Sequence, residues 1–463
     1  MFQINPESVA RPTPDLTERR SAILSGQTHA SAEIEACLAR AAEPAVAAAF
    51  LRLDAAAARG TARAVDAAFA HGAPLPPLAG LAVSVKDLFD VAGQTTAAAS
   101  RILRDAPPAA RDAPTVARLR AAGAALVGRT HMTEFAFSGV GLNPHHPTPV
   151  NVPMARLDPA TPRIPGGSSS GAATSVAGGA CWAALGSDTG GSLRIPAALQ
   201  GLVGFKSTAA RVPTAGAIPL SPTLDTAGAL TRSVRDAILL HELLAARRVE
   251  RPGRPLRATR FALPTTLMLD ALEPPVAAAF ERAVAALSSA GARIETIALP
   301  PLGELGPITA HGGFSAAESW AWHRHRLAER EADYDPRVAL RIRRGAAVSA
   351  ADYLDLRAAR RDWITRMRAS LHGFDALLSP TVPLLAPPLA ALEGSDEEFF
   401  RVNALLLRNP SVVNLLDGCA ISLPCHAPGT APVGLMLWQA GERDDALLDA
   451  ALAVEAALTE PRA

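Results

Sequence analysis

The stretch that decides the fold runs from Gly166 to Thr208: GGSSSGAATSVAGGACWAALGSDTGGSLRIPAALQGLVGFKST. Its pattern predicts a helix of small residues, an apolar strand, a Gly-rich turn and a second apolar segment. Small residues allow the backbone of such a helix to pack closely, and alternation of helix and strand favours an α/β fold.

The flanking sequence continues this alternation. An apolar run over 81–85 predicts a buried strand that ends near Lys86. Residues 113–123 predict a helix that Gly123 ends, and residues 124–130 predict a buried strand. Together these segments indicate further α/β units.

Longer segments complete the expected organisation. Residues 31–70 are Ala-rich and predict helices, whereas 143–171 are rich in Pro, Asn, Gly and Ser and predict a long loop. The region 270–372 predicts helices, and 373–458 predicts short apolar strands followed by a final helix. No repeat or linker divides the chain, which favours one structural domain.

Composition restricts the classes of function. The formal net charge is +1 over 463 residues, which gives no electrostatic reason to expect nucleic acid or an anionic membrane as a partner. The N-terminal residues 1–20 lack the apolar run of a secretory signal, so we expect a cytoplasmic protein. The longest charge-free stretch, 165–187, is too poor in large apolar residues for a membrane span.

Four cysteines predict reduced thiols rather than a disulfide framework: Cys37, Cys181, Cys419 and Cys425. Cys419, Cys425 and His426 lie close together in the sequence, but they lack a second pair of ligands for a metal. We therefore expect no metal site.

The use of lysine is unusual. Among 45 basic residues only Lys86 and Lys206 are lysine. A buried ammonium can lose its proton near neutrality, whereas a guanidinium stays charged. Lys86 is therefore a candidate base, and Lys206 is expected to support the turn that follows.

Two Gly-Ser clusters are candidate sites, at 165–171 and 186–192. Consecutive glycines before Ser192 let backbone N–H groups converge on one point, as an oxyanion site requires. The first cluster also matches the G-x-S-x-G elbow of α/β-hydrolases at Ser169, but no strand precedes it, and the oxyanion-like motif at 311–313 follows it instead of preceding it. Ser192 is the better candidate nucleophile.

The segment from Gly166 to Thr208 resembles the signature of the amidase signature family. The resemblance rests on the paired glycine-serine clusters, the run D-T-G-G-S-x-R-x-P-A from Asp188 and the interval between Ser168 and Ser192. Val83 to Asp87 matches the lysine segment of that family, and segments at 379–381, 421–425 and 432–435 match its C-terminal elements. The likeness covers nearly all of the chain after about residue 65.

The resemblance implies the fold and the domain organisation. It implies a single large α/β domain with a mixed, twisted central sheet covered by helices on both faces. Residues 1–64 would form a helical N-terminal lead-in and residues 65–463 the catalytic domain.

The resemblance also implies the catalytic roles. Ser192 would attack the substrate, and Ser168, after a cis peptide bond from Gly167, would lie hydrogen-bonded between Ser192 and Lys86. A neutral amine in a desolvated pocket can activate a serine in this way. This arrangement implies hydrolysis of linear carboxamides through an acyl-enzyme, with no cofactor.

Further roles follow from the same resemblance. The oxyanion hole would use the backbone N–H groups of Thr189, Gly190, Gly191 and Ser192. Three residues would support the turn and the relay: Ser169, Asp188 and Arg194. Apolar character, rather than the resemblance, makes three residues candidates for the substrate pocket, with the apolar C-terminal segments: Met132, Phe135 and Phe137. Apolar residues at such spacing are more often part of a core, which is the alternative. The histidines at 131, 145, 146, 323 and 325 would be surface or pocket residues outside any Ser-His-Asp triad.

Several alternatives stay open. Ser170 and Ala172 stand where the family pattern has Gly and Ser, and Lys206-Ser207-Thr208 replaces lysine-proline-threonine, so the subfamily is undetermined. Esters and carbamates are alternative substrates to a small-molecule amide, and a homodimer is one alternative for the assembly. Two alternative functions stay open. The chain could be the A subunit of a tRNA-dependent amidotransferase, which is its glutaminase component, or a catalytically silent binding scaffold.

Overall fold

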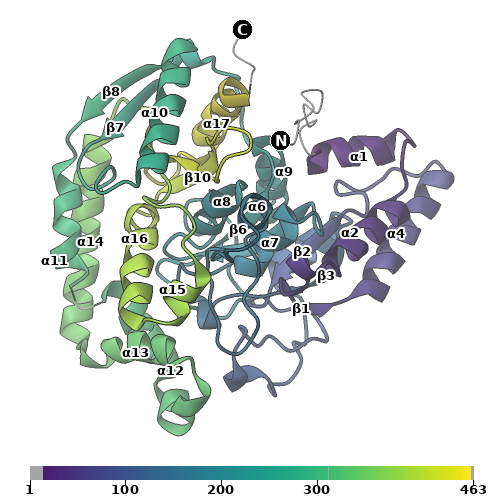
Figure 1. Ribbon diagram of the computed structural model, residues 1–463, viewed down its shortest axis with the longest axis horizontal. Helices are drawn as coiled ribbons and strands as arrows, with labels where there is room; N and C mark the ends of the chain where they lie inside the picture. The colour runs from purple at the N-terminus through teal and green to yellow at the C-terminus, as the bar shows by residue number, and fades with distance from the viewer. Residues whose placement is uncertain (1–13, 311, 460–463) are drawn as a thin grey trace.

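The computed structural model describes residues 14–310 and 312–459 and is built around one mixed sheet (Figure 1). The sheet has 11 strands in the order β1-β3-β2-β4-β6-β5-β10-β11-β9-β7-β8. The strands are β1 Phe50–Leu53, β2 Ala82–Lys86, β3 Ala125–Thr130, β4 Ala183–Asp188, β5 Val203–Lys206, β6 Thr226–Thr231, β7 Arg260–Pro264, β8 Arg293–Ile297, β9 Ala376–Pro380, β10 Cys419–Pro424 and β11 Gly434–Gln439. The predicted α/β class and mixed sheet are confirmed.

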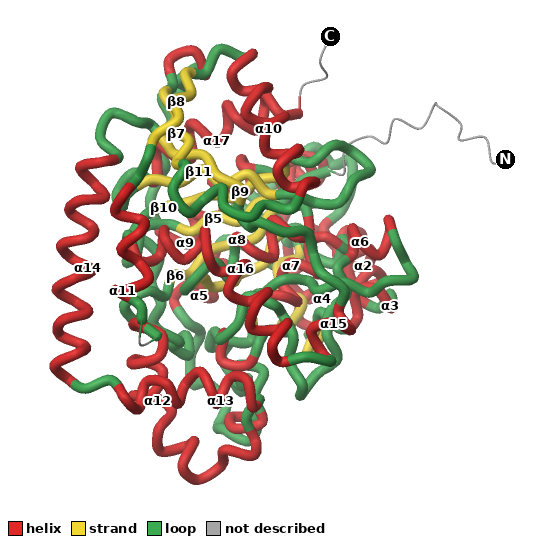
Figure 2. The backbone as a smooth tube through the Cα atoms, turned by 60° about the vertical axis from the view of Figure 1, so that its left-hand side comes forward, coloured by secondary structure: helices red, strands yellow, loops and turns green. Residues whose placement is uncertain are grey.

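Helices surround this sheet and make up most of the outer layers (Figure 2). They are α1 Leu16–Leu24, α2 Ala30–Ala41, α3 Pro44–Ala47, α4 Ala55–Ala70, α5 Pro114–Ala121, α6 Val152–Leu157, α7 Ser170–Ala177, α8 Arg194–Gln200, α9 Val234–Ala245, α10 Pro274–Ser289, α11 Leu305–Ile308, α12 Gly313–Arg330, α13 Pro336–Arg343, α14 Ala350–Ser370, α15 Leu389–Glu393, α16 Asp396–Leu415 and α17 Asp444–Thr459.

Strand β11 shows why both faces of the sheet are covered. Leu435 and Leu437 pack in one apolar cluster with residues of α9, α10 and α17. Met436 and Trp438 alternate with them and pack in another cluster with residues of α14 and α16. Because side chains of a strand point alternately to opposite faces, the consecutive apolar residues 435–438 must be covered on both faces.

The N-terminal region contributes to this sheet as well as to the helical layer. Strand β1 pairs antiparallel with β3, and the N–H of Asp54, directly after β1, donates to the carbonyl of Val127 at 2.9 Å. Residues 1–64, which the sequence predicts to be helical, therefore include an edge strand. The sequence missed it because four residues are too few to show a period against an Ala-rich background.

Other elements show where the pattern was informative. The predicted helix at 113–123 is α5, and the predicted strand at 124–130 is β3. The expected long loop contains the short helix α6, and the expected helical region 270–372 contains the strand β8. Helix α16 lies where strands were expected, because an internal proline, Pro410, and polar residues hide its helical period.

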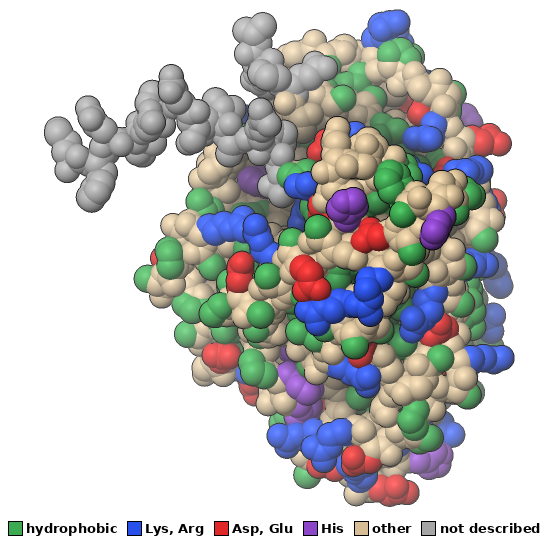
Figure 3. All heavy atoms as spheres, turned by 90° about the vertical axis from the view of Figure 1, so that its right-hand side faces the viewer, with side chains coloured by type: hydrophobic (Ala, Val, Ile, Leu, Met, Phe, Trp, Pro, Cys, Tyr) green, Lys and Arg blue, Asp and Glu red, His purple; other side chains and the backbone are tan. Residues whose placement is uncertain are grey.

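The surface carries both signs of charge. On the face over α1, α2 and α4, acidic and basic side chains are interspersed (Figure 3). Within the described residues, no helix is both long and apolar enough to cross a membrane.

Candidate active site

The site forms where two parallel strands end at the same edge of the sheet. Strand β2 ends at Lys86 and strand β4 at Asp188, and the two strands pair in parallel with Val85 opposite Leu185. The loop before α7 brings Ser168 to this edge, and the turn after β4 brings Ser192. Ligand sites of α/β sheets are found at such carboxyl ends.

Lys86 is completely buried among serine hydroxyls. Its Nζ donates to Ser168 Oγ at 2.8 Å, to Ser169 Oγ at 3.0 Å and to Ser187 Oγ at 2.8 Å. Burial lowers the pKa of Lys86 to about 7, against an opposing effect of the carboxylates of Asp188 and Asp225. The amine can therefore be neutral or charged near neutral pH, as a general base requires.

Ser168 and Ser192 come from different loops, and a backbone hydrogen bond joins the two loops. The peptide bond between Gly167 and Ser168 is cis, as the resemblance implied. The N–H of Ser169 donates to the carbonyl of Ser192 at 3.4 Å. Within the described chain no hydrogen bond joins the hydroxyls of Ser168 and Ser192, so only the Lys86 half of the expected relay is formed here. Catalytic hydrogen bonds often tighten only when substrate is bound.

A buried ion pair holds the turn that carries Ser192. Asp188 and Arg194, both with fully buried side chains, form two hydrogen bonds of 3.0 Å. Burial opposes ionisation of Asp188, but Arg194 and Asn414 outweigh it and lower the pKa of this carboxyl to about 2. Asn414, from α16, donates to Asp188 at 2.9 Å and accepts from Arg194 at 2.7 Å. The expected bracing role of Asp188 and Arg194 agrees with this geometry.

The backbone of this turn differs from the expected oxyanion hole at one residue, Gly191. The N–H of Gly191 donates to Asp188 Oδ1 at 2.8 Å, so it is not free to bind an oxyanion. The N–H groups of Thr189, Gly190 and Ser192 have no acceptor among the described residues, and these three residues line a cavity. Gly191 has a φ of 130°, and a Cβ there would lie 2.6 Å from Pro410 Cβ, so glycine is required for shape rather than for its N–H.

Thr189 links this turn to the next loop. Its hydroxyl donates to Asp225 Oδ1, and Asp225 Oδ2 accepts from the N–H groups of Leu220 and Ser221 at 3.0 and 3.1 Å. Burial raises the pKa of Asp225 to about 7, although these hydrogen bonds oppose the shift. The loop that contains Leu220 is thereby fixed beside Ser192.

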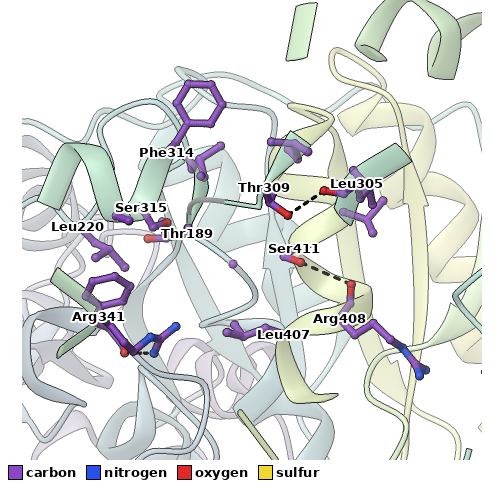
Figure 4. Close-up of a pocket in the computed structure, with 18 of the residues that line it drawn as sticks. Thr189, Leu220, Leu305, Thr309, Phe314, Ser315, Arg341, Leu407, Arg408 and Ser411 are labelled. Atoms are coloured by element: carbon purple, nitrogen blue, oxygen red, sulfur yellow. Dashed lines mark hydrogen bonds between the residues drawn. The ribbon is translucent and has the colours of Figure 1, made fainter. Parts of the chain in front are cut away.

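A cavity of about 430 Å³ opens directly beside Ser192 (Figure 4). Its wall is mostly apolar, with leucines from several elements and Phe314, and hydroxyls of Thr309, Ser315 and Ser411. Of the candidate pocket residues, Phe137 lines this cavity. Met132 and Phe135 are buried in the core instead, where the ring of Phe135 packs against His323 and Tyr334. Apolar spacing alone does not distinguish a pocket wall from a core.

Comparison with known proteins agrees with this geometry. The amidase family model matches residues 32–448. The chain belongs to the amidase family. It is 38% identical to the 2-amino-5-chloromuconic acid deaminase of Comamonas testosteroni, over 89% of this chain and 88% of that protein. It is 33% identical to the A subunit of the glutamyl-tRNA(Gln) amidotransferase of Salinispora arenicola, over 89% of this chain and 90% of that one.

A solved structure of an amidase gives the same result for the fold. It superposes with a TM-score of 0.85 at 35% identity and covers 96% of this chain and 99% of its own. This member of the amidase family is therefore a hydrolase that acts on amides.

The other candidate nucleophile is placed differently. Ser169 is fully buried, accepts a hydrogen bond from Lys86 and donates to the carbonyl of Ser187 at 3.2 Å. It does not line the cavity, whereas Ser192 does. In this amidase-family chain Ser169 is thus suited to position Lys86 and not to attack a substrate. His311 of the rival oxyanion motif lies outside the described residues.

No histidine or cysteine of the described residues lines the cavity beside Ser192. His131, expected at the surface or in a pocket, is buried and bonded to Ser170 Oγ at 2.8 Å, and His323 is buried against Tyr334. These two histidines are buried, against the expectation of a surface or pocket position, because a neutral imidazole with one hydrogen-bond partner is tolerated in a core. The four cysteines are free thiols, and no cluster of three metal-ligating His, Cys, Asp or Glu residues occurs in the described ranges.

Three residues near the site were not predicted to have a role: Ser187, Asp225 and Asn414. Ser187 stands in the quoted Gly-Ser cluster, so its proximity could have suggested a contact with Lys86. Asn414 is 226 positions from Asp188, and no sequence pattern signals their hydrogen bond. Lys206, for which a role in supporting a turn was expected, donates to the carbonyls of Ser207 and Gly418 next to the end of β5.

Proposed function

We propose that this chain hydrolyses linear carboxamides through an acyl-enzyme on Ser192, with Ser168 and Lys86 as the proton relay. The observation that carries the proposal is the contact of a fully buried Lys86 with Ser168, next to a cavity that Ser192 lines. A lysine of pKa about 7 supplies the base that a serine hydroxyl needs.

The reaction proceeds in two halves. The Oγ of Ser192 attacks the carbonyl carbon of the amide, and its proton passes to Ser168 while Ser168 gives its own proton to neutral Lys86. The C–N bond then breaks, and the proton returns through Ser168 to the leaving amine. Water attacks the acyl-enzyme by the same route, releases the carboxylic acid and regenerates Ser192.

The charge that develops on the carbonyl oxygen needs donors at the same point. We assign this role to the N–H groups of Thr189, Gly190 and Ser192, which belong to cavity-lining residues and have no protein acceptor among the described residues. Loss of one oxyanion donor typically costs about 3–4 kcal/mol of transition-state stabilisation. The rigid brace of Asp188, Arg194 and Asn414 keeps the turn in position.

The test combines labelling and turnover. A fluorophosphonate should label the wild type once, at Ser192, and a panel of small amides should show turnover. Ser192→Ala should abolish both, and Lys86→Ala should lower both by at least ~1000-fold because the base is lost. Ser315→Ala is the matched control, since Ser315 lines the same cavity but makes no contact with Lys86. Labelling that persists in Ser192→Ala would refute the mechanism.

A second candidate function is a glutaminase component of an amidotransferase. It is favoured by the 33% identity to the A subunit of the glutamyl-tRNA(Gln) amidotransferase of Salinispora arenicola. Glutamine-dependent release of ammonia, together with partner subunits in purification, would support it. The same panel should include esters and carbamates, and absence of labelling of Ser192 would indicate the binding scaffold.

The proposal includes a cytoplasmic location and a homodimer. Four free thiols agree with a reducing compartment. Cell fractionation tests the location, and light scattering of the purified protein tests the assembly.

A further inference from the structure

The cavity beside Ser192 has an unbalanced charge. Its charged lining residues are Arg341, Arg344 and Arg408, and no aspartate or glutamate lines it among the described residues. None of the three arginines forms an ion pair within the described part of the chain, although neighbouring arginines of α13 do. Arg337 pairs with Asp396 and Arg343 with Glu331.

Arg341, from α13, is the arginine that faces the interior. Its guanidinium lies 4.5 Å from the ring centroid of Phe137 and donates from Nη1 to the carbonyl of Phe137. Its other nitrogens have no acceptor among the described residues. Figure 4 shows Arg341 on the side of the cavity near Leu220, across from Thr309, whereas the side chain of Arg408 extends away from Ser411.

This placement leaves guanidinium N–H groups without a protein acceptor. Arg341 is partly exposed where it lines the cavity. Burial, and then the neighbouring Arg344, lower the pKa of Arg341 to about 10, so it stays charged at neutral pH. A guanidinium that has free N–H groups in one plane matches a carboxylate, which can accept two of them.

We propose that the amide substrate carries a carboxylate, separated from the scissile amide by a short apolar chain, and that Arg341 binds this carboxylate. The inference rests on the proposed attack by Ser192, which sets one end of the substrate. The apolar wall between the two ends is formed by side chains such as Leu220, Leu224 and Leu407. Arg341 is then a residue that determines substrate specificity.

The test uses substrates of matched length. The monoamides succinamate, glutaramate and adipamate are compared with the uncharged butyramide, valeramide and hexanamide, and N-butyryl-β-alanine places the carboxylate on the amine side. We expect at least one carboxylate-bearing amide to have a kcat/KM at least ~10-fold above that of its uncharged partner. Arg341→Met should reduce that ratio by at least ~10-fold, to about 1, mainly through KM, because a remote binding contact is lost.

Controls separate this role from a structural one. Arg343→Met removes a guanidinium from the same helix that pairs with Glu331 at the surface, and it should leave the ratio unchanged. Arg341→Lys keeps the charge and should retain part of the preference. If Arg341→Met lowers the melting temperature strongly, Arg341→Lys replaces it in the kinetic and binding measurements and should show a partial loss of the preference.

Binding is measured separately from turnover. Adipate and the uncharged hexanamide are titrated by calorimetry into Ser192→Ala, with and without Arg341→Met. Adipate should bind more tightly than hexanamide only when Arg341 is present. Equal kcat/KM for charged and uncharged amides, or adipate binding that is unaffected by Arg341→Met, overturns the inference while leaving amide hydrolysis intact. Loss of all turnover and labelling in the wild type would instead overturn the function, and the adipate titration would still decide the role of Arg341.

Discussion

Ser187→Ala tests the electrostatics around Lys86 most directly. Ser187 Oγ is one of three hydroxyls within 3.0 Å of Lys86 Nζ. A hydrogen bond to a charged group contributes about 1.5–3 kcal/mol and one between neutral groups about 0.5–1.5 kcal/mol. Removal of Ser187 Oγ therefore penalises the ammonium more than the neutral amine, by about 1–1.5 kcal/mol.

This difference predicts a shift of the pH profile. Since about 1.36 kcal/mol corresponds to one pKa unit, the pKa of Lys86 should fall from about 7 to about 6. The neutral amine is the active form, so activity is lost as the pH falls through this pKa, and the acidic limb should move to lower pH. At pH 6 each enzyme keeps only a fraction of its activity at high pH, and this fraction should be roughly fivefold larger for the variant than for the wild type.

The assay follows the second-order rate of fluorophosphonate labelling, or kcat/KM, against pH. Ser84→Ala is the matched control, because it removes a fully buried hydroxyl of β2 that bonds to Ser175 and not to Lys86. Its acidic limb should coincide with that of the wild type. An acidic limb of Ser187→Ala that stays in place or moves to higher pH would show that the hydroxyl does not stabilise the charged lysine.

The remaining predictions concern the turn and its stability. Gly191→Ala should lower the free energy of unfolding by about 2–5 kcal/mol and activity by at least ~100-fold, because the residue has a φ of 130° and its Cβ would lie 2.6 Å from α16. A Cβ at Gly190 has more space, so Gly190→Ala should unfold at a urea concentration closer to that of the wild type. Equal losses of stability in the two variants would contradict this reasoning. Asn414→Ala should lower the free energy of unfolding by about 2–4 kcal/mol, measured by thermal unfolding, because the ion pair of Asp188 and Arg194 loses a buried hydrogen-bond partner. An unchanged melting temperature would show that Asn414 does not stabilise this ion pair. Burial lowers the pKa of Lys86 in the folded state, so between about pH 7 and about pH 10 only the unfolded chain keeps the proton on this lysine. From about pH 7 to about pH 9 the free energy of unfolding of the wild type should therefore rise by about 2–3 kcal/mol relative to that of Lys86→Met. A difference between the two that stays constant with pH in urea unfolding would refute the pKa shift.

Local pattern was enough to identify the elements that position the site. The apolar run before Lys86 is the strand β2, and the small-residue run after Ser168 is the helix α7. Both are dense in residues with one structural preference, so neighbours in sequence determine the conformation. The short strand β1 and the helix α16 did not follow from pattern, because length or composition obscured their periods.

The sequence by itself identified the groups to which we assign the chemistry. The scarcity of lysine distinguished Lys86, and the glycines before Ser192 indicated a turn that exposes backbone N–H groups. These are properties of residue type and short spacing, which a chain records directly.

Tertiary structure alone decided how these groups are held and what meets them. It assigned the N–H of Gly191 to Asp188, placed Asn414 beside the same carboxylate and put Phe135 in the core while Phe137 lines the cavity. It also placed Arg341 at the cavity wall, together with Arg344 and Arg408. The physical reason is that burial and pairing depend on contacts between segments far apart in the chain, and such contacts leave no local pattern in the sequence.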